Sequence, residues 1–470
     1  MRIIGLDLAL TAEHKALIAD ARGQPLAPIL RLRTTASELT RLFQRAREGT
    51  APDEPVLLIM EPTGMAWLPV AVFAQRHQVT PHLVNSQQVA DLRRYYKKHA
   101  KSDRIDVRVL VKLPVVSPEK LHPLALPHAD LFACQRGCKE LDHLMTLSTA
   151  LQNRIHAIDG FAWPGLDAVL SEPFSPLTRW FREHWYQPHQ VLAAGAAVLE
   201  QAWQMEPAAR TVTAPEAWAP ALVRLAQHTL DLYGTDSPYL DYAYLQAEVT
   251  REQTLLAVVE AHHHTLQLQT VRPLYRHLHP SRNLETLKGV GQDGAAVYLS
   301  FIGDPHRFAD HSHFRGWTGM VPDSKQSGER EAKGLHISQA GPDLIKKFAY
   351  LDAETARQWD PQIAAIYYTC TARKCRCDQM VEHGKHHNQA ICACGTHLLD
   401  RIWTILIEDR PYELRDVDGT PVTVEQARAI IAERYTVPKE VRQRNNQRTR
   451  RARMERRAER KAERESRASQ

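Results

Sequence analysis

Long apolar runs are scarce in this 470-residue chain. The longest, 191–199, spans about nine residues, whereas a membrane-spanning helix needs about 20, so we expect no transmembrane segment. The first apolar stretch contains Asp7 and carries no small-residue cleavage site, so we expect no secretory signal. Cysteines number only seven, and five of them crowd between Cys370 and Cys394. This distribution is not a disulfide framework and favours a cytoplasmic protein.

The body of the chain also lacks net positive charge. Residues 439–470 hold 13 Lys and Arg against 5 Asp and Glu, whereas residues 1–438 hold 47 against 49. The tail has almost no apolar side chains, so it should be disordered or form a solvated helix. A basic tail of this kind binds phosphate backbones without sequence preference. The alternative is a tail that only keeps the protein in solution.

An α/β layer fold is predicted for the first 100 residues. The hydrophobic fraction of 43 % supports a sizeable core, and the length suggests two to four domains. Ile4, Leu6 and Leu8 share one face of a first strand, and Asp7 lies on the other face beside Gly5. The apolar run 56–60 is typical of a buried strand. The other expected elements are strands at 14–19, 29–34 and 82–84, a helix capped by Ser37, and helices at 67–76 and from Ser86 onward.

Helices are predicted for most of the rest. Proline and tryptophan punctuate 160–220, which indicates several short helices and loops. Residues 239–277 form a long amphipathic pattern that suits a coiled coil or dimer contact and equally an ordinary bundle helix. Shorter helices are expected at 295–301, 344–358 and 391–407. Before the first of these, Gly289 and Gly291 form a Gly-x-Gly turn whose free N–H groups suit a phosphate, although a simple tight turn is the more frequent role of such glycines.

Four carboxylates stand out as candidate metal ligands. Asp7 lies in the first strand, Glu61 ends the buried strand 56–60, and Asp103 and Asp106 are spaced to share one helix face. Converging carboxylates repel one another unless a cation lies between them, and hard oxygen ligands suit Mg²⁺ or Mn²⁺. Two such ions can hold the attacking and leaving oxygens of a phosphodiester displacement. Taken singly, Asp103 and Asp106 could equally be surface charges paired with neighbouring arginines.

A basic patch accompanies these carboxylates. Tyr95 and Tyr96 precede the cationic side chains Lys97, Lys98, Lys101 and Arg104. This combination suits a nucleic-acid backbone, and the alternative is a solvated helix face. Cys370, Cys375, Cys377, Cys392 and Cys394 lie near several histidines, but their Cys-x-Cys spacing is poor for zinc. Small buried thiols are therefore favoured over a zinc site.

The motifs together resemble a known family. An Asp on strand one, a Glu on the fourth strand and Asp-x-x-Asp resemble the ribonuclease-H-like fold of RuvC-type resolvases. More closely, Gly5-Leu6-Asp7, Met60-Glu61-Pro62-Thr63-Gly64 and Lys101-Ser102-Asp103-Arg104-Ile105-Asp106 resemble the DEDD insertion-sequence transposases of the IS110 family. That family has a second motif block, and Gly289-Val290-Gly291, Gly319-Met320-Val321-Pro322, Gln326-Ser327-Gly328 and Ile337-Ser338 occur here in its order. The resemblance covers roughly 1–150 and 280–410.

The resemblance implies a DNA recombinase with two kinds of site residue. Asp7, Glu61, Asp103 and Asp106 match the metal-binding carboxylates, for Mg²⁺ or Mn²⁺, and Ser327 matches a serine nucleophile that forms a covalent link to DNA. Also implied are a bridge RNA encoded beside the gene, a homo-oligomer (dimer or tetramer), nucleic-acid contacts that would include Lys325, and action at the nucleoid of a prokaryotic cell. The expected domains are 1–115 (ribonuclease-H-like), 116–280 (helical connector with a coiled-coil segment), 281–415 (mostly α, serine-bearing) and 416–470 (C-terminal extension with basic tail).

Departures from the family pattern leave alternatives. The usual Ser-Ser-Gly-Gly loop is Gln326-Ser327-Gly328-Glu329 here, and Ser324 is a second candidate nucleophile. The rival activities are a structure-selective nuclease that uses the tetrad and water, and a non-catalytic nucleic-acid-binding protein. A sugar-kinase or actin-like ATPase also opens with strand–Asp, but 10–14 contains no glycine for a phosphate loop.

Overall fold

The structure, a computed structural model, divides the chain into two compact units, Met1–Pro127 and His128–Gln470. It describes residues 1–51, 53–96, 103–235, 238–322, 326–327, 330–331, 337–338, 340–372, 386–447, 450–451 and 454.

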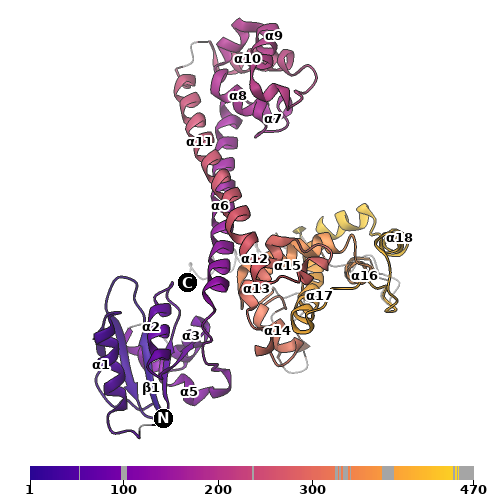
Figure 1. The fold of residues 1–470 in the computed structure, drawn as a ribbon. Coiled ribbons are helices and arrows are strands. Elements are labelled where there is room, and N and C mark those ends of the chain that lie inside the picture. Colours follow the sequence, from indigo (N-terminus) through magenta and orange to yellow (C-terminus); the bar gives the residue numbers. More distant parts are fainter. Residues whose placement is uncertain are drawn as a thin grey trace, which may run out of the picture. The chain divides into compact units, whose positions relative to one another are not determined.

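A mixed five-stranded sheet forms the centre of the first unit (Figure 1). Its strands are β1 (Arg2–Asp7), β2 (His14–Ala19), β3 (Leu30–Leu32), β4 (Val56–Met60) and β5 (Thr80–Leu83), in the order β3-β2-β1-β4-β5. The first three strands are antiparallel neighbours, and β4 and β5 run parallel to β1. This topology is compatible with a ribonuclease-H-like domain.

Each face of the sheet has its own core. Ile4 and Leu6 of β1 belong to one cluster, which α1 (Ala36–Arg47) and α2 (Trp67–Arg76) complete. Ile3 belongs to the opposite cluster, which α3 (Ser86–Tyr96), α4 (Asp103–Leu110) and α5 (Leu113–Val116) cover, followed by η1 (Pro118–Lys120). The alternation along β1 thus separates two helical layers. The predicted cap was wrong by two residues, because Thr35 rather than Ser37 accepts from the first-turn N–H of Glu38 and begins α1.

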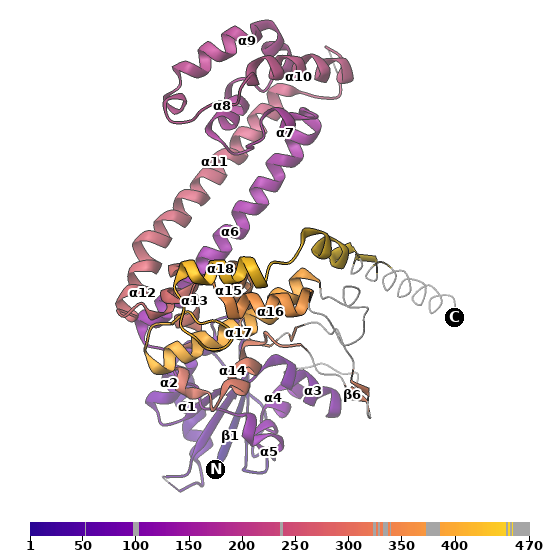
Figure 2. The ribbon, with the colours of Figure 1, turned by 90° about the vertical axis from the view of Figure 1, so that its right-hand side faces the viewer.

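Two long helices dominate the second unit (Figures 1 and 2). They are α6 (Ala129–Ala162) and α11 (Tyr242–Leu266). Arg154 pairs with Glu248 at 3.0 Å, and Glu140 lies 3.6 Å from His262. Because the sequence order of the partners is reversed, the helices run antiparallel. The long amphipathic pattern at 239–277 therefore finds a partner helix within the same chain, and it continues through the π-turn η3 (Gln267–Val271) into α12 (Arg272–Leu278).

A small helical lobe caps the end of this pair. Its elements are α7 (Leu166–Val169), α8 (Pro176–His184), α9 (Pro188–Met205), η2 (Pro207–Arg210) and α10 (Trp218–Tyr233). Asp159 of α6 and Arg182 of α8 form a buried ion pair at 2.6 Å inside it. The Tyr186 hydroxyl also donates to Asp159, at 2.8 Å. The Pro- and Trp-rich stretch therefore folds as the expected short helices.

The remaining elements of this unit accompany the long helix α17 (His387–Glu408), which packs against several of them. They are η4 (Asn283–Thr286), α13 (Gln292–Ile302), η5 (Pro305–Arg307), α14 (His311–Thr318), β6 (Gln326–Ser327), β7 (Arg330–Glu331), α15 (Asp343–Ala356), α16 (Pro361–Thr371) and α18 (Val424–Arg434). Within the described residues, α17 alone is long and apolar enough to cross a membrane by length and composition. Its buried face, which includes Ile391, Leu398 and Ile402, belongs to the core of this unit.

Candidate functional site

Asp7 and Glu61 lie at neighbouring ends of two central strands. Asp7 is the last residue of β1, and Glu61 directly follows the last residue of β4. The parallel register pairs Leu6 with Met60, so the next position on each strand places Asp7 beside Glu61. Both residues are half-buried. The alternation that turns Ile3 and Ile59 toward α4 places Asp7 and Glu61 on that same face.

Helix α4 packs directly on β1 at Gly5. A Cβ atom at Gly5 would lie 2.7 Å from the Val107 carbonyl oxygen and 2.9 Å from Val111 Cγ1. The far end of α4 leads toward Gly23, where a Cβ would meet the Val111 oxygen at 2.8 Å. Gly23 follows β2, whose last residue, Ala19, pairs with Ile3 at the start of β1. Helix α4 therefore runs opposite to β1, with its first turn at the Asp7 end.

This direction places the start of the Asp-x-x-Asp motif near the two strand ends. Asp103 precedes Val107 by one helical turn, a rise of about 6 Å. Asp7 follows Gly5 by two residues along the strand, a similar rise of about 6.6 Å. The backbone thus carries all four predicted carboxylate positions to the same end of the sheet. The side chains of Asp103 and Arg104 lie outside the described part of the structure, as do Lys97, Lys98 and Lys101 entirely.

Asp106 has a cationic partner that the sequence analysis missed. Arg93 of α3 donates from Nη1 to Asp106 Oδ1 at 2.8 Å, and Asp106 is 8 % exposed. Asp106 Oδ2 makes no hydrogen bond with any described residue. A buried carboxylate needs a partner of this kind to offset its desolvation. No spacing rule in the sequence points to this pair, which forms because α3 and α4 pack against each other.

The carboxylates fit a hard divalent cation by donor type. Asp7 and Glu61 are adjacent, Asp106 keeps one oxygen uncommitted among the described residues, and carboxylate oxygens are the ligands that Mg²⁺ and Mn²⁺ prefer. Among the residues whose placement is described, no group of three or more His, Cys, Asp or Glu side chains comes close enough to hold a metal ion. Asp103, which the sequence predicts to belong to the same set, has a side chain outside the described part of the structure.

Ser327 lies in the second unit, in a short hairpin. Strands β6 and β7 pair antiparallel, with Gln326 opposite Glu331 and Ser327 opposite Arg330. Ser327 is thus the last residue of β6, and Gly328 and Glu329, which follow it in the sequence, lie outside the described residues. The alternative nucleophile Ser324 and the predicted contact Lys325 fall outside the described residues. The carboxylates and the serine belong to different units of the chain.

The Gly-x-Gly turn has a packing role that is visible in the structure. Gly289 has φ +101°, and a Cβ there would lie 2.5 Å from the Asp352 carbonyl oxygen of α15. Gly291 is the exposed N-cap of α13, with open space around its Cα. Asp293 in the first turn of α13 pairs with Arg272 at 2.9 Å. Gly289 therefore lets α15 approach, and Gly291 keeps the helix start accessible.

The cysteine-rich segment is described only in part. Cys394 is fully buried in the core, and burial raises the pKa of its thiol to about 12. Burial also raises the pKa of the Cys392 thiol. Such thiols stay protonated at neutral pH, which is the behaviour of small buried hydrophobic side chains. Cys375 and Cys377 fall outside the described residues.

Two family models match the chain in separate regions. Residues 4–158 match the DEDD-type IS110 model, described as a transposase. Residues 281–368 match the model described as the transposase IS116/IS110/IS902 family. Together the two regions cover just over half of the chain, and they include both the carboxylates and Ser327. No curated protein matches the chain.

Proposed function

The chain belongs to the IS110 family of insertion-sequence transposases, and we propose that it cuts and rejoins DNA through a covalent serine–DNA intermediate. The observation that carries the proposal is the meeting of three chain segments at one end of the sheet. Strand β1 ends at Asp7, β4 leads into Glu61, and α4 begins there with Asp103. A transposase binds DNA, so a phosphodiester is the group that this arrangement would handle.

In this proposal the N-terminal unit is a ribonuclease-H-like domain whose carboxylates hold Mg²⁺ or Mn²⁺. Asp7, Glu61, Asp103 and Asp106 would supply the oxygens. A bound divalent ion would neutralise phosphate charge and stabilise the oxygens that develop charge during phosphodiester exchange. Arg93 holds Asp106 through one carboxylate oxygen and keeps its χ angles fixed, so the other oxygen stays available. Arg93 is thus a positioning residue.

Ser327 is the proposed nucleophile. Its Oγ would form a bond to the DNA phosphorus while the bond from phosphorus to one deoxyribose oxygen breaks. The serine proton leaves to a base, and the departing deoxyribose oxygen takes up a proton. The phosphate remains a diester throughout, because its bond to one deoxyribose oxygen is replaced by a bond to the serine oxygen. Attack by a hydroxyl of another strand then reverses the step and rejoins DNA at a new place.

The partners follow from the same proposal. We propose that the carboxylates of one protomer and Ser327 of another meet in a homo-oligomer, a dimer or tetramer, acting in the cytoplasm at the nucleoid. A bridge RNA would select the DNA. The support is the family resemblance, together with basic residues close to Asp103 and Asp106 in the sequence, among them Lys97, Lys98, Lys101 and Arg104. Lys325 and the Gly289–Gly291 turn would contribute further nucleic-acid contacts.

A denaturing gel tests the proposal. The protein is mixed with labelled element-end DNA, RNA transcribed from the flanks of its gene, and Mg²⁺. Wild type should give a protein–DNA adduct, and Ser327→Ala and Asp103→Asn should give none. Two matched controls, the exposed Ser312→Ala and Asp53→Asn, should leave the adduct unchanged. Cleavage without an adduct that survives in Ser327→Ala would instead show a nuclease that uses water.

A further inference from the structure

The chain around Ser327 pairs with itself at two places, at Ser327 and where it joins the body of the second unit. The two segments at that junction are the outgoing arm, 318–322, and the returning arm, 337–341. Pro322 pairs with Ile337 in an antiparallel bridge between the arms, and Ser327 ends the first strand of the antiparallel pair β6–β7. An isolated two-stranded hairpin is marginally stable in water. The place of Ser327 therefore depends on what holds the arms.

The two arms cross with backbone contact next to that bridge. A Cβ atom at Gly319 would lie 2.0 Å from the Ala340 carbonyl oxygen, and a Cβ at Gly341 would lie 2.2 Å from the Trp317 carbonyl oxygen. Both glycines also have positive φ angles, +68° and +72°, which other residues rarely adopt. The crossing fixes the arms against each other, but it does not by itself fix the direction in which the hairpin points.

Helix α17 holds the outgoing arm. Met320 is 2 % exposed, and its Cε lies 2.8 Å from the point that a Cβ of Gly395 would occupy, so its side chain is seated on α17. The hydroxyl oxygen of Thr396 lies 2.5 Å from the Met320 carbonyl oxygen and 3.1 Å from the Cys392 carbonyl oxygen. A hydroxyl has one proton to donate, and Met320 offers the nearer acceptor.

Helix α15 holds the returning arm. The Lys346 ammonium donates to the Ala340 carbonyl oxygen at 2.9 Å, and the Lys346 side chain is 11 % exposed. The same ammonium pairs with Asp343 at 2.9 Å, but the Asp343 side chain is 97 % exposed. An ion pair with so exposed a partner is weak. The bond to Ala340, in contrast, ties the arm to a side chain that its surroundings hold in place.

We propose that Thr396 and Lys346 are positioning residues for Ser327, each fixing one arm through a backbone carbonyl. Ser327 is five positions beyond Pro322, and a tilt of about 5° at the arms would move a tip about 17 Å away by about 1.5 Å. A misplacement of about 1 Å can cost about 100-fold in rate. This role rests on the proposed function of Ser327 as the nucleophile.

Single-turnover adduct formation at saturating DNA tests the role in the full chain, with the element-end DNA, flank RNA and Mg²⁺ of the denaturing-gel assay. Thr396→Val keeps the shape of the side chain and removes its hydroxyl, and Lys346→Met removes the ammonium. Each variant should react about tenfold or more slowly, with the Kd for DNA unchanged. Thr396→Ser keeps the hydroxyl and should restore most of the rate.

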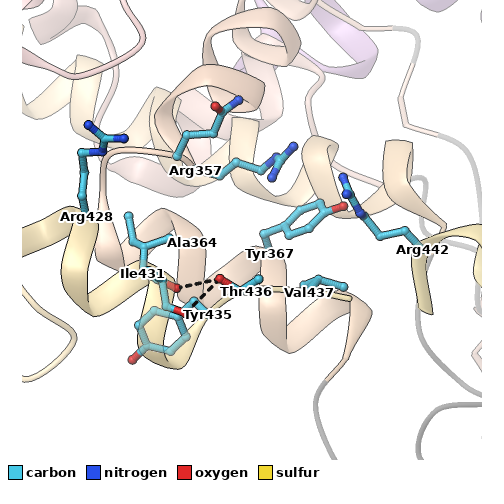
Figure 3. A pocket seen from close by; sticks show the side chains of 11 residues that line it. Arg357, Ala364, Tyr367, Arg428, Ile431, Tyr435, Thr436, Val437 and Arg442 are labelled. Carbon is cyan, nitrogen blue, oxygen red and sulfur yellow. Dashed lines mark hydrogen bonds between the residues drawn. The ribbon is translucent and has the colours of Figure 1, made fainter. Parts of the chain in front are cut away.

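Three control variants should react at the wild-type rate. Thr404→Val removes a hydroxyl of the same helix, which bonds back to the Asp400 carbonyl oxygen at 2.9 Å. Lys347→Met removes the neighbouring ammonium, which pairs with Asp142 of α6. Arg428→Gln removes an exposed cation at a cavity of about 320 Å³ between α16 and α18 (Figure 3), and none of the residues that line this cavity belongs to either arm.

Hydrogen exchange of the Ser338 amide reports on the arms without any chemistry. This amide donates to the Val321 carbonyl oxygen at 2.8 Å, and it should exchange faster in Thr396→Val and Lys346→Met than in the controls, while α6 exchanges as in wild type. Equally faster exchange throughout the second unit would indicate a general loss of structure and overturn the role.

The adduct rates separate this role from the proposed function. Equal rates in the two variants and the controls, with a normal wild-type reaction, would overturn the positioning role alone. Weaker DNA binding by Lys346→Met with an unchanged rate at saturation would make Lys346 a DNA contact and would overturn its positioning role too. No adduct from wild type would overturn Ser327 as the nucleophile, and this role with it.

Discussion

The contact between α4 and Gly5 predicts that a single methyl group disturbs the carboxylate site. In Gly5→Ala the new Cβ would lie 2.7 Å from the Val107 oxygen, 2.9 Å from Val111 Cγ1 and 3.0 Å from Leu110 Cβ. Ordinary van der Waals contact begins at 3.4 Å, so α4 must retreat by about 0.7 Å. Two of the three obstacles belong to the backbone or to a Cβ, which cannot rotate away.

The displacement of α4 should lower both the stability of the protein and the rate of DNA cleavage. Overpacking of this kind destabilises by about 1–3 kcal/mol. A shift of about 1 Å in a catalytic group can cost about 100-fold in rate, so a retreat of about 0.7 Å should slow DNA cleavage by roughly 10-fold to 100-fold. The rate falls because Asp103 and Asp106 move with α4, whereas Asp7 and Glu61 stay with the sheet.

Urea unfolding and the rate of adduct formation measure the two effects separately. Gly160→Ala is the matched control, because that glycine is inside α6 with open space around it. This control should gain about 0.5–1 kcal/mol and react at the wild-type rate. Gly5→Ala with normal stability and normal rate would refute the close packing of α4 on β1. Lost stability with a normal rate would refute the claim that this packing positions the carboxylates.

Three other predictions concern stability, pH and the tail. Burial raises the pKa of the Asp352 carboxyl to about 7, so the folded state keeps a proton that the unfolded state loses. The free energy of unfolding should fall by up to about 4 kcal/mol as pH rises from about 4 to 7. Urea unfolding at several pH values should show a weaker pH dependence of stability in Asp352→Asn than in wild type. The same pH dependence in both proteins would contradict the raised pKa of Asp352. Asp159→Ala leaves the fully buried Arg182 without its carboxylate partner and should lower the free energy of unfolding by about 3–5 kcal/mol. Loss of the exposed Arg154 pair should lower it by less than about 1 kcal/mol. Similar losses of stability in both variants would refute this difference between the buried and the exposed pair. Deleting 448–470 removes 10 Lys and Arg against 4 Asp and Glu. The affinity for double-stranded DNA should then drop for every DNA sequence, and the slope of log affinity against log salt concentration should flatten by about 0.9 per lost phosphate contact. An unchanged slope would show that the tail does not bind the DNA backbone.

Much of the first unit could be predicted from sequence, because its signals are local. The apolar run 56–60 coincides with β4, and 14–19 coincides with β2. Alternation correctly put Asp7 opposite the face of Ile4 and Leu6. The helix at 67–76 also coincides with α2. The predicted N-cap of α1 was wrong because Thr35 and Ser37 are both residue types that favour an N-cap. The local sequence does not decide at which of the two the helical backbone begins.

The non-local parts of the site could not be predicted in this way. The Arg93–Asp106 pair depends on how α3 packs on α4, and nothing in the spacing of the two residues fixes that angle. Gly5 was noted beside Asp7, but its role follows only from the helix that crosses it. The partner of the long helix at 239–277 could not be predicted either. An amphipathic pattern indicates that one face of the helix is covered, but it does not identify the segment that covers it. Helix α6, about 100 residues earlier, provides that cover.

Mass spectrometry of the trapped complex tests the central claim most directly. The adduct is digested with nuclease and protease, and the peptide that retains a nucleotide is sequenced. The account predicts one modified peptide with the nucleotide linked through phosphate to Ser327, and no such peptide from Asp103→Asn. Modification at Ser324 would move the nucleophile by three residues. A nucleotide on a residue outside 281–415, or cleaved DNA with no modified peptide, would contradict serine-mediated recombination.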